Sequence, residues 1–137
     1  MNVKTLRTIL FIALLVHGIG HIQGVVCALG LKFRESSSSV SWLLKGLGTK
    51  ANAALCLFFY LATAVFGILT ALSLKGILIQ QASWPVLALL TAILSTVCLV
   101  LFPRALAMFF NMAGAIMVNL ALYYLLITGN DFYSVSE

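Results

Sequence analysis

The chain of 137 residues is 63% hydrophobic and only 8% charged, whereas soluble domains average roughly 45–50% apolar and about 25% charged residues. A mean hydropathy of +1.15 leaves too few polar side chains to cover a core in water. The net charge of +5 comes from eight Lys and Arg against three acidic residues, but the basic residues lie at or between apolar runs, where they anchor helix ends and meet anionic headgroups. The composition excludes an ordinary soluble protein, argues against a nucleic-acid partner, and makes the lipid bilayer the expected surroundings.

Four apolar stretches are long enough to cross a membrane, because about 20 residues at about 1.5 Å each span the hydrocarbon core. In chain order they cover about residues 6–31, 51–74, 84–102 and 105–127. Nothing in the chain alternates as the strands of a membrane barrel do. The sequence therefore predicts an all-α polytopic membrane protein, with residues 1–137 forming a single domain built as a four-helix transmembrane bundle.

The ends of the spans and their connections carry further signals. The first span is too long for the apolar region of a signal peptide and has no small-x-small cleavage site, so we expect it to be retained. The longest connection, 32–50, contains an apolar segment around Trp42 that either lies in the membrane interface or is an irregular polar loop with one aromatic anchor. Pro103 predicts a tight turn that makes the third and fourth spans antiparallel neighbours.

The distribution of basic residues favours an orientation with both termini outside. The N-terminus, the second connection and the C-terminal tail together hold three basic residues, whereas the first and third connections hold five. Lys4 and Arg7, next to the first span, favour the opposite orientation.

The first span contains two histidines that share one helical face near the middle of the bilayer. His17 and His21 are four residues apart, and the small residues Gly20, Gly24 and Ala28 project from the same side. A small-x-x-x-small repeat lets two helices approach closely and needs no ligand. Alternatively, the imidazoles bind a metal, a cofactor or a polar ligand in a space that the missing side chains leave. The Glu that accompanies an i, i+4 histidine pair in hydrolytic zinc helices is absent.

Polar residues of the other spans reach a similar depth. Asn119 of the fourth span is expected level with the histidines, and Asn111 and Tyr123 follow the same stripe of that helix. These side chains either complete a ligand-binding layer of histidine and asparagine or cross-link the bundle by hydrogen bonds. For Thr63 and Thr91 we expect structural bonds, since a threonine can bond to its own helix backbone.

The three cysteines are expected near the same side of the membrane. Cys27 lies near the end of the first span, Cys56 near the start of the second and Cys98 near the end of the third. A tetrahedral metal site would need a fourth ligand at that depth, and the histidines lie too deep to provide it. We therefore expect buried cysteines that pack as small hydrophobic residues.

Several cofactors remain open from the sequence. A haem with two axial ligands would need His17 or His21 together with Met112 or Met117, or one histidine from each copy in a dimer. Another tetrapyrrole, a quinone or a metal ion is equally compatible with the residue types. Methionines in apolar helices, however, more often serve packing.

The motif His17-Gly-x-x-His21 followed by Gly24, in a chain of four spans, resembles a group of small four-helix prokaryotic membrane proteins loosely related to the DoxX-like superfamily. The resemblance covers the architecture and the first helix. It implies a prokaryotic cell membrane and permits a link to quinone-coupled redox systems or redox accessory complexes. It carries no catalytic residue to this chain.

The leading functional hypothesis is a non-catalytic membrane protein, an accessory subunit or a binder of an apolar cofactor or lipid-like ligand at the layer of His17, His21 and Asn119. One alternative is a haem- or metal-containing membrane oxidoreductase coupled to quinone, and another is a small proton-coupled transporter. If the edge of Gly20, Gly24 and Ala28 is not fully covered inside one bundle, it should pack against another copy or another subunit. We therefore also expect a homo-oligomer or a subunit of a larger complex, with a monomer as the alternative.

Overall fold

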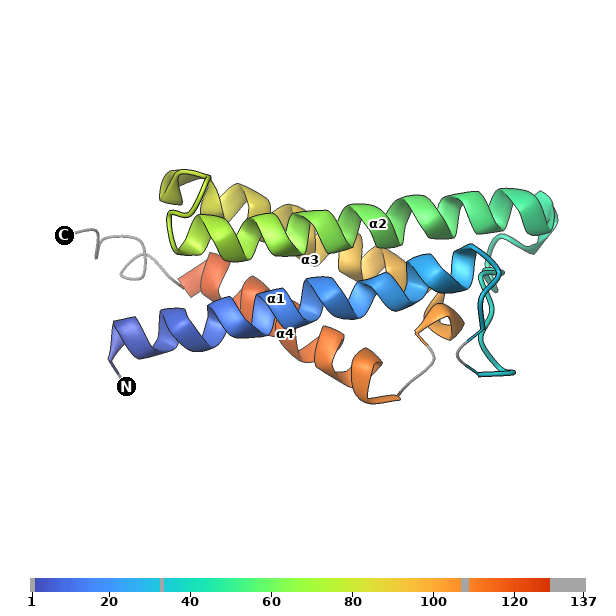
Figure 1. Cartoon of the computed structure of the whole chain (residues 1–137), viewed down its shortest axis with the longest axis horizontal. Coiled ribbons are helices and arrows are strands. Elements are labelled where there is room, and N and C mark those ends of the chain that lie inside the picture. Colours follow the sequence, from blue (N-terminus) through green and yellow to red (C-terminus); the bar gives the residue numbers. More distant parts are fainter. Residues whose placement is uncertain (1, 33, 107–108, 129–137) are drawn as a thin grey trace.

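A computed structural model describes residues 2–32, 34–106 and 109–128 of the chain. Four long helices follow one another up and down: α1 (Val3–Ala28), α2 (Gly48–Leu74), α3 (Trp84–Leu101) and α4 (Phe109–Thr128). Figure 1 shows them side by side, with the start of α1 and the end of α4 at the same end of the bundle. All four are long and apolar enough to cross a membrane. The prediction of an all-α four-helix transmembrane bundle is confirmed.

The helix ends correct the predicted spans by a few residues. The first helix ends at Ala28 rather than near Leu31, because Gly30 adopts a φ of +88° and its N–H bonds to the Cys27 carbonyl. This left-handed residue directly after the cap terminates the helix. The fourth helix begins at Phe109 rather than Ala105, since Pro103–Ala105 forms a separate 3₁₀ turn, η3.

The closest helix pair is α1 and α2, and glycines explain why. A Cβ on Gly18 would lie 3.0 Å from the Ala64 carbonyl oxygen, and a Cβ on Gly67 would lie 3.1 Å from the Gly18 Cα. The two backbones therefore meet where neither helix carries a side chain, which is the close approach that small residues permit in membranes. Among the helix pairs, α1 and α2 accordingly have the most extensive contact.

The most exposed helix is α4. Only 17% of its most apolar 18-residue stretch is buried inside the bundle, compared with 33% to 39% of the corresponding stretches in the other three helices. It contacts α3 extensively and α1 sparsely, and in Figure 1 it runs obliquely across the other helices. The beginning of α4 thus diverges from α1, and His17, His21 and Asn111 of the predicted site lie along this diverging seam.

The long connection between α1 and α2 is attached to one end of the bundle. The Ser41 N–H donates to Oδ1 of the fully buried Asn52, whose Nδ2 donates to the carbonyls of Leu44 and Gly48. The Trp42 Nε1–H donates to the Val100 carbonyl at 2.6 Å. Apart from the 3₁₀ turn η1 (Lys45–Leu47), the described residues of the connection form an irregular loop. The backbone of this segment is therefore mostly irregular, and Trp42 attaches it to the end of α3.

Candidate functional site

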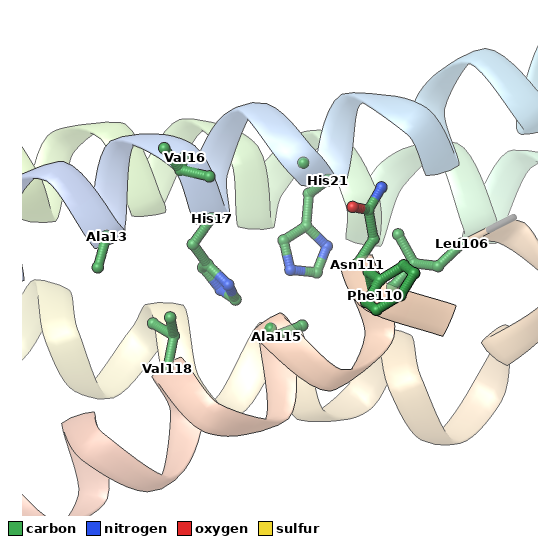
Figure 2. Close-up of a pocket in the computed structure, with 11 residues that line it drawn as sticks. Ala13, Val16, His17, His21, Leu106, Phe110, Asn111, Ala115 and Val118 are labelled. Carbon is green, nitrogen blue, oxygen red and sulfur yellow. The ribbon is translucent and has the colours of Figure 1, made fainter. Parts of the chain in front are cut away.

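The two histidines lie together on the inner face of α1, as their spacing predicts. Their ring centroids are 4.6 Å apart and the ring planes meet at 78°. Only 6% of His17 and 1% of His21 is exposed. Figure 2 shows both rings projecting from α1 into the space in front of α4.

A chain of hydrogen bonds attaches His21 to α3 and α4. His21 Nε2 lies 3.1 Å from Ser95 Oγ, and Asn119 Nδ2 donates to the same hydroxyl oxygen at 3.0 Å. The Asn119 amide also donates to Thr96 Oγ1, which lies 3.2 Å from the Tyr123 hydroxyl. One polar network at the centre of the bundle therefore joins three helices.

This network favours one tautomer of His21. Ser95 Oγ already accepts a hydrogen bond from Asn119, and among the described residues His21 Nε2 is the acceptor within reach of the Ser95 proton. The arrangement that satisfies most groups therefore has Ser95 donating to Nε2, which assigns the ring proton of the neutral imidazole to Nδ1. In that tautomer His21 has an N–H group left to donate.

Three buried polar atoms at this site have no hydrogen-bond partner within the described part of the chain: His17 Nε2, His21 Nδ1 and Asn119 Oδ1. Each of the three residues is more than nine-tenths buried. An unsatisfied buried polar group costs about 1–3 kcal/mol, and the hydrocarbon core has no bulk water to satisfy it. Such groups are typical of a site that a ligand or ordered water completes.

A cavity of about 240 Å³ adjoins the two histidines, between α1 and α4 (Figure 2). It exists because α4 diverges and because Gly20 and Gly114 have no atom within 4 Å of where a Cβ would lie. Among the described residues, no Lys, Arg, Asp or Glu side chain lines it. The lining residues are Ala13, Val16, His17, Gly20, His21, Leu106, Phe110, Asn111, Gly114, Ala115 and Val118.

The cavity opens toward the bilayer. Val16 and Phe110, on its two sides, are 63% and 83% exposed on membrane-spanning helices. At the far end, Asn111 Nδ2 donates to Oε1 of the buried Gln23 at 2.8 Å and joins α4 to α1. A molecule would reach the histidines sideways from the lipid.

The predicted site residues thus take different places. His17, His21 and Asn111 line the cavity, whereas Asn119 lies behind His21 and Tyr123 lies further along the network. The small residues Gly20, Gly24 and Ala28, which were predicted to form one edge, also have different surroundings. Gly20 faces the cavity, Gly24 packs against the Tyr60 ring, and Ala28 packs at the margin of the cysteine cluster.

The cysteines converge as expected and belong to a packed core cluster with Tyr60 and Phe102. Cys27, Cys56 and Cys98 are all buried and free. Within residues 2–32, 34–106 and 109–128, no group of three or more His, Cys, Asp or Glu residues could hold a metal ion. The prediction that the cysteines pack as small hydrophobic residues is confirmed.

Thr63, Thr91, Met112 and Met117 do not line the histidine cavity. Thr63 and Thr91 each bond to the carbonyl four residues earlier, as expected, and Thr91 also bonds to Thr70 of α2 at 2.8 Å. Met112 packs beside the cysteine cluster, and Met117 is 67% exposed on the lipid-facing side. Neither methionine lines the cavity next to the histidines.

Sequence reasoning did not single out Gln23, Ser95 or Thr96. Gln23 is the most polar uncharged residue of the first span after the histidines, and this polarity was a signal that could have marked it. Ser95 and Thr96 carried no comparable signal, because small hydroxyl residues in membrane helices commonly bond to their own backbone.

Comparison with protein-family models, with curated proteins and with solved structures found no match to this chain. The fold and the geometry of the site are therefore the grounds on which its function is inferred.

Proposed function

We propose that this small integral membrane protein is a non-catalytic binder of an apolar cofactor or lipid-like ligand, held in the cavity between α1 and α4. The observation that carries the proposal is the pair of unpartnered nitrogens, His17 Nε2 and His21 Nδ1, on two buried histidines beside a mostly apolar cavity. A ligand with a polar group on an apolar body would satisfy the nitrogens and fill the cavity together. Sites for small molecules typically have this combination of apolar walls and a few converging polar groups.

The tautomer of His21 favours hydrogen bonding over metal or haem ligation. A metal ion needs the lone pair of an unprotonated nitrogen, whereas the arrangement in which Ser95 donates to Nε2 places the ring proton on Nδ1. An N–H at this position is a donor for a carbonyl or hydroxyl oxygen.

The hydrogen-bonded chain behind His21 also argues against a proton-coupled transporter. A proton moving from His21 toward Tyr123 would have to pass Asn119, whose Nδ2 donates to both Ser95 and Thr96. An amide NH₂ group has no lone pair available to accept a proton in transit. The network therefore holds His21 in place and is a poor path for protons.

The test is to identify what copurifies with the protein in mild detergent. We expect a bound small molecule in organic extracts of the wild type and of A54L, a control that adds the same side chain at an exposed site of α2. G20L, which fills the cavity, should lose that molecule and keep the fold. A Soret band, stoichiometric metal, or an extract unchanged by G20L would contradict the proposal.

Assembly into a homo-oligomer or a larger complex is a second part of the proposal, and the exposure of α4 supports it. Leu120 and Ile127 are 60% and 81% exposed on this helix, where a partner helix would gain packing contacts. The mass of the protein in nanodiscs tests this expectation, and a strictly monomeric mass would contradict it.

The orientation and the relationship to other proteins are also proposals. Both termini outside a prokaryotic cell membrane agrees with the count of basic residues, and a cysteine introduced at Asn2 should react with an impermeant maleimide in intact cells. A relationship to the DoxX-like superfamily rests on the motif of His17 and His21 with Gly24.

A further inference from the structure

A second cavity continues the first along the seam of α1 and α4. It has a volume of about 370 Å³ and is lined by Leu6, Ile9, Leu10, Ala13, Met117, Val118, Ala121, Tyr124 and Leu125. Ala13 and Val118 line both cavities, so the two spaces adjoin. Apart from the Tyr124 hydroxyl and the Met117 thioether, the side chains of this groove are hydrocarbon.

The groove runs from the middle of the bilayer toward the end of the bundle where α1 begins. From His17 back to Leu6 is eleven residues, or about 16 Å along the helix at 1.5 Å per residue. Ile9 and Met117 on its margins are 52% and 67% exposed, so it is open to the membrane. The histidine cavity thus lies at one end of the seam and a long apolar groove at the other.

The lining of the histidine cavity indicates what chemistry suits its occupant. No charged side chain from the described part of the chain lines it, and a charged headgroup without a partner at mid-membrane depth is unfavourable. In the tautomer that the Ser95 contact favours, His21 has an N–H on Nδ1 to donate. A neutral group with an oxygen acceptor, such as a carbonyl, matches both conditions.

We propose that the ligand is a neutral single-chain amphiphile whose carbonyl-type head accepts a hydrogen bond from His21 and whose chain lies in the groove between Leu6 and Leu125. This inference rests on the proposed function and specifies the chemistry and the pose of the ligand. The continuity of the groove with the histidine cavity distinguishes it from the ordinary lipid-facing surface, which any acyl chain covers.

The test uses two methyl ketones that share a head and differ in chain length, in phosphatidylcholine nanodiscs. One is 2-tetradecanone with a photoactivatable diazirine near the end of its chain, and the other is 2-pentanone. We expect the long probe to label residues 6–13 and 117–125 saturably. Unlabelled 2-tetradecanone should compete, whereas tetradecane, which lacks the carbonyl, should not.

Two variants provide a matched comparison. A121W fills the groove, and L120W adds the same side chain at an exposed neighbouring site outside either lining. A121W should weaken saturable labelling at least tenfold. The short ketone 2-pentanone should shift the His21 ¹⁵N signals equally in the wild type and in A121W. L120W should behave as the wild type does.

The outcomes separate the two proposals. If 2-pentanone shifts the His21 ¹⁵N signals while the long probe labels lipid-facing residues around the whole bundle without saturation, the chain does not occupy the groove and this inference is wrong. If neither ketone shifts those signals and the cavity holds only water, the proposed function fails as well.

Discussion

Gly24 of α1 lies directly against the ring of Tyr60 in α2, and this ring occupies the space that a side chain at residue 24 would need. The Tyr60 hydroxyl donates to the Phe102 carbonyl at 2.9 Å, so the ring is held from its other end and has little room to move. The His21 ring also lies beside it, with centroids 5.4 Å apart. Tyr60 therefore links the close contact of α1 and α2 to the wall of the histidine site.

Replacing Gly24 with alanine should destabilise the bundle by about 1–3 kcal/mol, the usual cost of overpacking a core. The added methyl group would overlap the Tyr60 ring, which cannot withdraw without breaking its bond to Phe102. Unfolding in SDS titrations, followed by circular dichroism, measures the change.

The matched control is Gly20→Ala, on the same helix and four residues away. A Cβ at residue 20 has nothing within 4 Å, so the stability of the Gly20→Ala variant should equal or slightly exceed that of the wild type. Equal losses in both variants would show that the glycines matter for a reason other than the Tyr60 contact.

Ser95→Ala should shift the tautomer equilibrium of His21. In the wild type, the Ser95 hydroxyl at 3.1 Å favours a proton on Nδ1, and ¹⁵N spectra of labelled histidine should show that form. Without the hydroxyl, Nε2 and the Asn119 amide each lose a partner. The spectra should move toward the other tautomer, and stability should fall by about 1–3 kcal/mol.

Thr96→Val tests the same network without touching His21. It removes the bond that the Asn119 amide donates to Thr96 and the bond between Thr96 and Tyr123. The variant should therefore lower stability and leave the His21 tautomer unchanged. A wild-type His21 that already carries its proton on Nε2 would overturn the assignment.

Thr70 and Thr91 should show only a weak coupling despite their short bond of 2.8 Å. Each hydroxyl also bonds to its own helix, Thr70 to the Phe66 carbonyl and Thr91 to the Leu87 carbonyl. A double-mutant cycle with valine should therefore give about 0.6 kcal/mol, the average for such bonds in membranes. A coupling above about 2 kcal/mol would mean that this pair is a major contribution to the stability of the contact between α2 and α3.

The sequence was sufficient to predict the fold and part of the site. Hydropathy and length locate four helices, since the bilayer imposes both, and the four-residue spacing puts His17 and His21 on one face. The oblique course of α4 was not predictable, because hydropathy does not specify how a helix rotates or crosses its neighbours. For the same reason the sequence did not indicate that Asn119 lies behind His21, bonded to Ser95, and not on the cavity wall.

The bond between Gln23 and Asn111 should contribute more to the position of α4 than an average interhelical bond. It joins α1 to α4 at 2.8 Å where these helices otherwise have sparse contact, and Gln23 is 9% exposed. We expect Gln23→Leu and Asn111→Leu each to lower stability and a double-mutant cycle to give a coupling near the upper end of the membrane range, about 1.7 kcal/mol. Amide hydrogen exchange should also become faster over residues 110–115. Thr128→Val is the control, because within the described residues the Thr128 hydroxyl bonds to the Tyr124 carbonyl of its own helix, and its loss should leave exchange at 110–115 unchanged. A coupling near zero, with exchange unaltered in both leucine variants, would show that packing against α3 alone positions the start of α4.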